Sequence, residues 1–274
     1  MRPVLKVLTA LLSIIAVLYL TICLYFYFSQ DEMIFPATKL EANYKFSFDQ
    51  PFKEYNIKNV NDTLSGVLFK ADKPKGLIFY LHGNGGTVED WSVIAPLYNG
   101  KTPYNKLQYD LFILDYPGYG KSTGNVHNED ELLRSIQTAF DTIKANYNQQ
   151  PVIIMGYSIG TGLATWLASK NNCSKLVLFA PYYSLPDLVA TLYPYLPSSL
   201  ILKYKLETYK YLPQVKAPIT IFHGNADKLI YYGSSVKLKS QFKVNDRLII
   251  LDGQGHNHIQ ENKIFLKEIE NTLR

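Results

Sequence analysis

The chain has 274 residues, a formal net charge of +5, 47% hydrophobic residues and 14% aromatic residues. This length and apolar content allow a substantial core without disulfide or metal staples. Basic residues do not cluster with aromatic ones, so we expect no nucleic-acid partner. Cys23 and Cys173 define no disulfide framework, and we expect both to be structural.

An uncharged segment, residues 7–28, predicts a transmembrane helix near the N-terminus. As a helix it is long enough to cross a hydrocarbon core of about 30 Å. It exceeds the apolar region of a secretory signal, and no small-x-small cleavage motif follows it. Tyr19, Tyr25 and Tyr27 lie toward its end, as in an interfacial aromatic belt. We interpret residues 1–30 as an uncleaved single-pass anchor.

The basic residues around this segment favour one orientation in the membrane. Arg2, Lys6 and the terminal amine precede the span, while Lys39 and Lys45 follow it fairly soon. Because Lys and Arg near a span prefer the cytoplasmic side, we expect the remaining chain on the non-cytoplasmic side.

Residues 31–274 alternate strand-like and helix-like segments and predict one domain. Segments 54–60 and 63–70 are expected to form a hairpin. Buried strands are expected at 76–83, 109–118, 151–158, 175–181, 217–224 and 246–253, and helices at 128–147, 159–170 and 257–274. This order favours an α/β fold with a mostly parallel, doubly wound sheet.

One segment, residues 182–216, interrupts the alternation and is rich in tyrosine and proline. It is too long for an ordinary loop, so we expect it to form a small cap over the ligand site. Packing of a single helix onto the sheet explains its tyrosines equally well.

Reactive residue types follow the apolar strands, where parallel sheets bind ligands. They occur in HGNGG (82–86), DYPGYGKS (115–122), GYSIG (156–160), HGNAD (223–227) and GQGHNH (253–258). GYSIG lies between a strand and a helix, which predicts a sharp elbow that exposes Ser158 as a nucleophile. Gly156 and Gly160 would permit close packing, and the amide of Ile159 would bind an oxyanion. The alternative is a glycine-rich turn needed only for packing.

A serine nucleophile needs a base, and the order Ser158, then an aspartate, then histidine resembles that of α/β-hydrolases. The five motifs together resemble the small membrane-anchored branch of that superfamily, some members of which cleave palmitoyl thioesters from proteins. The resemblance implies that Asp227 is the acid and that the backbone N–H of Asn84 is an oxyanion donor. Asp187 is a rival acid, whereas Asp252 lies too close to the histidines in the sequence.

Two neighbouring histidines compete for the role of base. We expect Asn257 to cap the final helix, which would place His258 in its first turn, where the helix dipole disfavours imidazolium. His256 would lie in the preceding loop, and the family pattern G-x-G-H-N also favours it. The role of His258 stays open. A zinc site is not expected, since acidic or thiol ligands are not near in the sequence.

Three other histidines are expected to have structural or surface roles. His82 and His223 would stabilise loops, and His127 would lie on the surface.

These features predict a serine hydrolase that acts on an ester, thioester or amide through an acyl-enzyme, without a cofactor. The expected substrate is a small or lipid-derived acyl compound, or an acylated protein. The alternatives are a peptidase or aminopeptidase, an acyltransferase, and a catalytically silent binding module tethered to the membrane.

Overall fold

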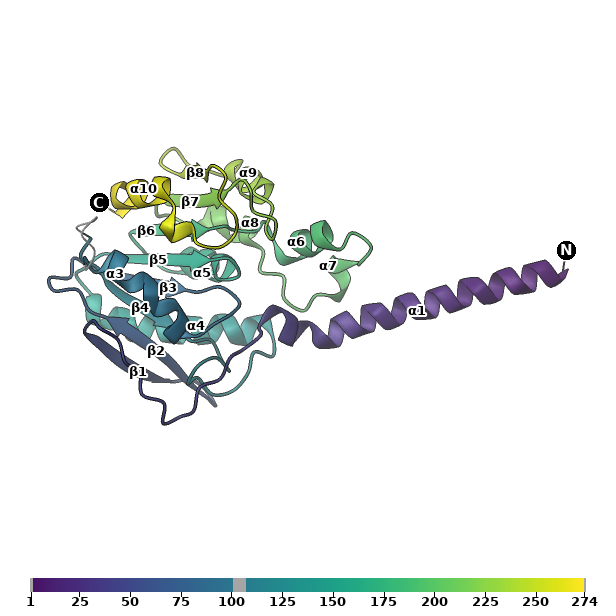
Figure 1. Cartoon of the computed structure of the whole chain (residues 1–274), viewed down its shortest axis with the longest axis horizontal. Coiled ribbons are helices and arrows are strands. Elements are labelled where there is room, and N and C mark those ends of the chain that lie inside the picture. The colour runs from purple at the N-terminus through teal and green to yellow at the C-terminus, as the bar shows by residue number, and fades with distance from the viewer. Residues whose placement is uncertain (1, 101–106, 274) are drawn as a thin grey trace.

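A computed structural model of the chain describes residues 2–100 and 107–273. Within these residues, eight strands form one sheet in the order β1-β2-β4-β3-β5-β6-β7-β8 (Figure 1). The strands are β1 (Phe52–Lys58), β2 (Thr63–Phe69), β3 (Leu77–Leu81), β4 (Asp110–Leu114), β5 (Val152–Tyr157), β6 (Lys175–Phe179), β7 (Ile219–Gly224) and β8 (Arg247–Leu251). β1 and β2 form the expected hairpin and β2 pairs antiparallel with β4, while all pairs from β4 to β8 are parallel. The predicted α/β fold with a mostly parallel sheet is confirmed.

The central strands are buried on both faces, as their continuous apolar sequences predict. The same prediction is wrong for β8. This strand lies at the sheet edge, and Arg247 and Ile250 are exposed, so only Leu251 of the strand is buried. An apolar run is therefore not sufficient to place a strand in the middle of a sheet.

Helices cover both faces of the sheet and enclose two hydrophobic cores. One core includes side chains of α4 (Glu129–Lys144), α5 (Gly160–Lys170) and α9 (Gly233–Lys239), with the 3₁₀ turn η2 (Ala145–Tyr147). The other includes side chains of α2 (Val88–Trp91), η1 (Ser92–Ile94), α3 (Ala95–Tyr98), η4 (Ile259–Glu261) and α10 (Lys263–Leu273). The helices α2, α3 and α9 were not predicted, since each is only one or two turns long.

The N-terminal helix α1 (Arg2–Ile34) projects away from the domain (Figure 1). Within Pro3–Ile34, an 18-residue stretch has a mean hydropathy of 2.6 and is almost entirely exposed to solvent. By length and composition this helix is a candidate membrane span or signal sequence.

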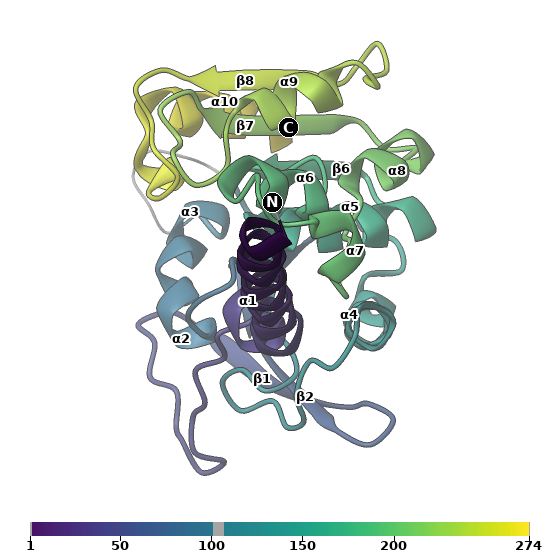
Figure 2. The ribbon, with the colours of Figure 1, turned by 90° about the vertical axis from the view of Figure 1, so that its right-hand side faces the viewer.

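Residues 182–216, which we call the cap, form the short helices α6 (Leu185–Leu192), α7 (Ser198–Ile201), α8 (Thr208–Tyr211) and the 3₁₀ turn η3 (Leu212–Gln214). Figure 2, a view along α1, shows α6 and α7 next to that helix. Tyr182 and Tyr204 are fully buried, whereas Tyr193 and Tyr195 are exposed. The tyrosines of the cap thus divide between packing onto the domain and a surface near α1.

Candidate active site

Ser158 lies on a sharp turn between β5 and α5. Its φ of 53° lies in the left-handed region, which costs a non-glycine residue on the order of 1–3 kcal/mol. Two hydrogen bonds hold the turn: Ser158 N donates to Phe179 O at 2.9 Å, and Thr161 N donates to Ser158 O at 2.9 Å. A Cβ at Gly160 would lie 2.1 Å from Leu81 O, so only glycine lets α5 begin this close to β3. This is the elbow that the GYSIG motif predicts.

Three side chains from separate loops form a hydrogen-bonded series at the carboxyl edge of the sheet. His256 Nε2 lies 3.0 Å from Ser158 Oγ, and His256 Nδ1 lies 2.7 Å from Asp227 Oδ2. With its proton on Nδ1, the imidazole donates to Asp227 and accepts from the Ser158 hydroxyl. The arrangement can therefore pass the hydroxyl proton to His256 while Asp227 fixes the ring.

The carboxylate of Asp227 is buried, and both of its oxygens accept hydrogen bonds. Its Oδ1 accepts from the amides of Leu229 and Ile230, each at 2.8 Å. Burial alone would raise the pKa of Asp227, but hydrogen bonds from His223 and His256, together with the backbone, outweigh it and hold the pKa well below its usual range. Asp227 is thus an anion at neutral pH and stabilises a positive charge on His256.

The HGNGG loop follows β3 and lies beside Ser158. Three side chains donate hydrogen bonds to its carbonyl oxygens: Tyr116 to His82, Tyr119 to Asn84 and Trp91 to Gly85, at 2.8, 2.8 and 2.9 Å. The Gly83 carbonyl, in the same peptide plane as the Asn84 N–H, lies 2.7 Å from His82 Nδ1, so the four contacts together fix the peptide planes of the loop. The backbone of Asn84 is therefore held in place next to the nucleophile, where the predicted oxyanion donor must lie.

The DYPGYGKS motif supplies residues of this support that the sequence did not reveal. Tyr116 and Tyr119 come from it, and so does Asp115, whose Oδ1 accepts from Val88 N at the start of α2 at 2.8 Å. Burial raises the pKa of Asp115 to about 7. The signal was present, because the motif follows β4 as the other motifs follow their strands, yet no side chain in it suggested a role.

The other acidic candidates lie elsewhere. Asp187 forms an ion pair with Lys237, with 2.7 Å between Oδ1 and Nζ. Asp252 accepts a hydrogen bond from Asn225 at 2.7 Å. Of the three aspartates considered, only Asp227 contacts His256.

The remaining histidines contact the loops around the site or solvent. His223 is buried, with Nδ1 2.6 Å from Ser235 Oγ and Nε2 2.9 Å from Ile230 O, and it supports the Asp227 loop. His82 is buried against Tyr116, and burial lowers the pKa of His82 to about 4, so it is neutral at neutral pH. His127 is exposed.

The prediction that Asn257 caps the final helix is wrong. His258 has a φ of 63°, a left-handed conformation that no helix continues through, and α10 begins only at Lys263. Asn262 is the cap, since its side chain accepts from the amides of Ile264 and Phe265 at 2.9 and 3.3 Å. The dipole argument against His258 therefore fails, and the preference for His256 rests on its contacts. The imidazole of His258 is exposed and lies 2.8 Å from Glu261 Oε1.

Two spaces meet at Ser158. The larger is a cleft of about 1040 Å³ lined by the HGNGG loop, Trp91 and the segment from His256 to His258. The smaller is an apolar cavity of about 180 Å³ lined by Ile159, Tyr182, α6 and the last residues of α1. Asn84 and Leu229 border both. Ser158 thus lies between a wide cleft, lined by both polar and apolar residues, and a narrow apolar cavity.

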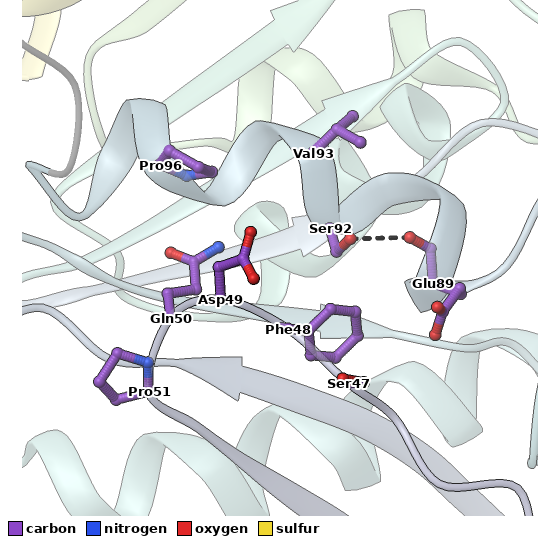
Figure 3. A pocket seen from close by; sticks show the side chains of 9 residues that line it. All are labelled: Ser47, Phe48, Asp49, Gln50, Pro51, Glu89, Ser92, Val93 and Pro96. Atoms are coloured by element: carbon purple, nitrogen blue, oxygen red, sulfur yellow. Dashed lines mark hydrogen bonds between the residues drawn. The ribbon is translucent and has the colours of Figure 1, made fainter.

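A third hollow, of about 570 Å³, lies between residues 47–51 and the helices α2 and α3 (Figure 3). Two serines, Ser47 and Ser92, line this hollow, but the described residues that line it include no histidine, and Ser92 donates to the backbone carbonyl of Glu89 at 2.8 Å. We therefore place the candidate chemistry at Ser158.

Comparison with known proteins identifies the family. A sequence profile described as alpha/beta hydrolase fold matches residues 76–200. An alpha/beta hydrolase, L404, of Acanthamoeba polyphaga mimivirus is 31% identical over 208 residues, which cover 73% of each chain. The chain belongs to the alpha/beta hydrolase family. Hydrolysis is accordingly the class of reaction that the family supports.

More distant relatives agree with this assignment. Protein bem46 of Schizosaccharomyces pombe is 27% identical to this hydrolase, over 61% of the chain and 56% of the relative. The human alpha/beta hydrolase domain-containing protein 17C is 24% identical, over 79% of the chain and 64% of the relative. The match thus spans about half to two thirds of the length of these two proteins.

Solved structures show the same fold. Est1E from Butyrivibrio proteoclasticus, determined with ferulic acid, has a TM-score of 0.66 and 18% identity, over 80% of this hydrolase and 97% of Est1E. An esterase from Pyrococcus furiosus has a TM-score of 0.66 and 16% identity, over 86% and 94% of the two chains. At these identities the likeness concerns the fold.

Proposed function

We propose that this hydrolase is a membrane-anchored serine hydrolase that cleaves an ester or thioester bond of an acyl substrate. The observation that carries the proposal is the series Ser158–His256–Asp227, with contacts of 3.0 and 2.7 Å at a strained elbow. The esterases among its structural neighbours fit this reaction class, and the relatives belong to the same family.

The reaction begins with His256 Nε2 taking the proton from Ser158 Oγ as the oxygen attacks the acyl carbonyl. The negative charge that develops on the carbonyl oxygen is stabilised by the backbone N–H groups of Asn84 and Ile159. Imidazolium forms on His256 and is stabilised by the anionic Asp227. Collapse of the tetrahedral intermediate breaks the bond to the leaving group, which receives the proton from His256. An acyl-enzyme on Ser158 remains.

Water then releases the acyl group. His256 accepts a proton from the water, whose oxygen attacks the acyl carbon, and the proton returns to Ser158 Oγ as the carboxylic acid leaves. The sequence of steps regenerates the hydroxyl and the neutral imidazole and requires no cofactor.

The two spaces at Ser158 suggest how a substrate lies. The apolar cavity, with Leu185, Leu188 and Val189 of α6 in its wall, suits the acyl chain. The wider cleft suits the alcohol or thiol portion, which can be as large as a peptide. Of the two carboxylates among the described residues that line the cleft, Asp90 caps α2, and Glu261 is exposed beside His258. The apolar cavity is the feature that favours an acyl substrate over an aminoacyl amide.

A fluorophosphonate probe tests the proposal on the full chain in membranes. The native chain should be labelled, and Ser158→Ala should not be, while Ser122→Ala, a serine at the end of another motif, should label normally. Labelling of Ser158→Ala would overturn the nucleophile assignment. A folded native chain without labelling would instead favour the silent binding module.

A further inference from the structure

The cap packs along the helix α1 on one helical face. Contacts along this face include three between residues 19 and 30 of α1 and the cap: Tyr19 Oη donates to Tyr195 O at 2.9 Å, the rings of Phe26 and Tyr193 lie 6.0 Å apart, and Gln30 Nε2 donates to Ile201 O at 3.1 Å. Cys23, on the same face, is 9% exposed although its neighbours on α1 are open to solvent. The spacing of these positions is that of one side of a helix. The cap is thus fitted to α1 over three turns.

The charges of the two segments stop at the same level. Lys203 of the cap forms an ion pair with Asp31 of α1, with 2.9 Å between Nζ and Oδ2. Beyond this pair α1 carries no charge across residues 28 to 7, and the cap carries none across residues 202 to 188. Two segments far apart in the sequence therefore pass from charged to uncharged at one plane.

The cap extends well past this plane. Tyr19 and Asp31 are twelve residues apart on α1, which is about 18 Å along a helix axis. Most of the exposed side chains at this end of the cap are apolar or aromatic: Leu200 is 82% exposed, Tyr195 61% and Leu192 39%. Ser199 is an exposed polar residue among them, and the ammonium of Lys205 donates to its carbonyl oxygen. Figure 1 shows α6 and α7 projecting on the side from which α1 leaves the domain. We call residues 192–200 the cap tip.

We propose that the cap tip is a second membrane contact, immersed in the same leaflet as α1, so that an acyl chain enters the cavity at Ser158 from the hydrocarbon. The partner of this surface is the lipid bilayer itself. The Lys203–Asp31 pair then lies at the headgroup level, where charges are tolerated, and the exposed apolar side chains lie among acyl chains. The assignment of the substrate rests on the proposed function, whereas the membrane contact does not.

The cavity is continuous with this surface. Its wall includes Met33 at the end of α1 and Leu192 at the end of α6, which are 48% and 39% exposed. Its volume of about 180 Å³ is below the usual range of about 300–1,000 Å³ for ligand pockets, so a long acyl chain cannot fit within it. The far end of such a chain would pass between Met33 and Leu192 and stay in the bilayer.

Fluorescence quenching tests the membrane contact directly. Leu200→Trp in the full chain, reconstituted in nanodiscs with lipids brominated on the acyl chains, should show a blue-shifted and quenched signal above that of the native chain. Val244→Trp is the matched control, since Val244 is fully exposed on the loop before β8. Quenching of Leu200→Trp no greater than that of Val244→Trp would overturn the proposal.

Hydrolysis of two substrates tests the entry route. Leu200→Glu should lower the hydrolysis of a long-chain acyl thioester embedded in nanodiscs by about tenfold or more, because a carboxylate is costly in hydrocarbon. The same variant should hydrolyse water-soluble p-nitrophenyl acetate at the native rate. The control variant Val244→Glu should hydrolyse both substrates at the native rate. An unchanged rate on the embedded thioester would contradict entry from the bilayer. If the native chain hydrolysed neither substrate, the proposed function would be refuted, while the quenching result would still test the membrane contact.

Discussion

Replacing Asp227 by asparagine should abolish most of the turnover by reversing the tautomer of His256. In the structure, Oδ1 of Asp227 accepts two backbone amides and Oδ2 accepts from His256 Nδ1. The carbonyl oxygen of an asparagine would take the place of Oδ1, because only an acceptor satisfies the two amides. Its NH₂ group would then face Nδ1. His256 would respond by placing its proton on Nε2, toward Ser158, where it can no longer act as a base.

The expected loss is large because both the base and the stabilisation of imidazolium disappear. The corresponding change in a Ser-His-Asp site lowers kcat by about 10⁴-fold, so we expect a fall of about 10³–10⁴-fold here. This equals about 4–5.5 kcal/mol in the activation free energy. KM should change little, since Asp227 is buried behind His256 and lines neither the cleft nor the apolar cavity.

The assay is the hydrolysis of p-nitrophenyl butyrate by the full chain in detergent micelles, with Asp187→Asn as the matched control. Asp187 pairs with Lys237 away from His256, so its variant should stay within about twofold of the native kcat, as expected for a surface ion pair. The melting temperature of each variant verifies that it is folded. A folded Asp227→Asn protein that keeps more than about a tenth of the native kcat would refute the reasoning, and a larger loss in Asp187→Asn would transfer the role to that residue.

Three further predictions follow from the site. His256→Ala should abolish the hydrolysis of p-nitrophenyl butyrate, while His258→Ala should keep most of it because its imidazole is exposed and contacts only Glu261; equal losses would contradict the assignment. Tyr119→Phe should lower kcat by about tenfold without raising KM, since it frees the Asn84 carbonyl and so loosens the peptide next to the one that carries the Asn84 N–H; an effect on KM alone would speak against a role in oxyanion binding. Asp115→Asn should become more stable relative to the native chain as the pH rises from about 4 to about 7, and no further, in urea unfolding. The reason is that burial raises the pKa of Asp115 in the folded state to about 7, so that ionisation of the native carboxyl disfavours folding. The difference in unfolding free energy is at most about 4 kcal/mol, and an equal difference at pH 5 and pH 8 would contradict the prediction.

Much of the sheet and the three proposed catalytic residues could be predicted from the sequence. Continuous apolar runs locate the buried strands, because a parallel sheet covered on both faces excludes polar side chains from its centre. Ser158 could be located because an elbow of this geometry needs glycine on both sides, and the collision of a Cβ at Gly160 with Leu81 O shows why. His256 was selected partly by family resemblance, and its contacts now support that choice.

Other features depend on contacts that no local pattern contains. Asn257 and Asn262 are equally good caps by residue type, and only the left-handed backbone of His258 decides between them. The edge position of β8 follows from the strand order and not from its own sequence. The contact between Tyr19 and Tyr195 joins residues 176 positions apart, so neither segment alone indicates that the cap rests on α1.

If Ser158 carries the acyl group during turnover, the mass of the peptide that contains it must change. The full chain would be mixed with an acyl thioester, quenched with acid during steady-state turnover, digested with trypsin and measured by mass spectrometry. The peptide containing Ser158 should gain the mass of the carboxylic acid less one water, and the adduct should be absent from Ser158→Ala. Turnover in the native chain with Ser158 unmodified, or with the adduct on another residue, would contradict this role of Ser158.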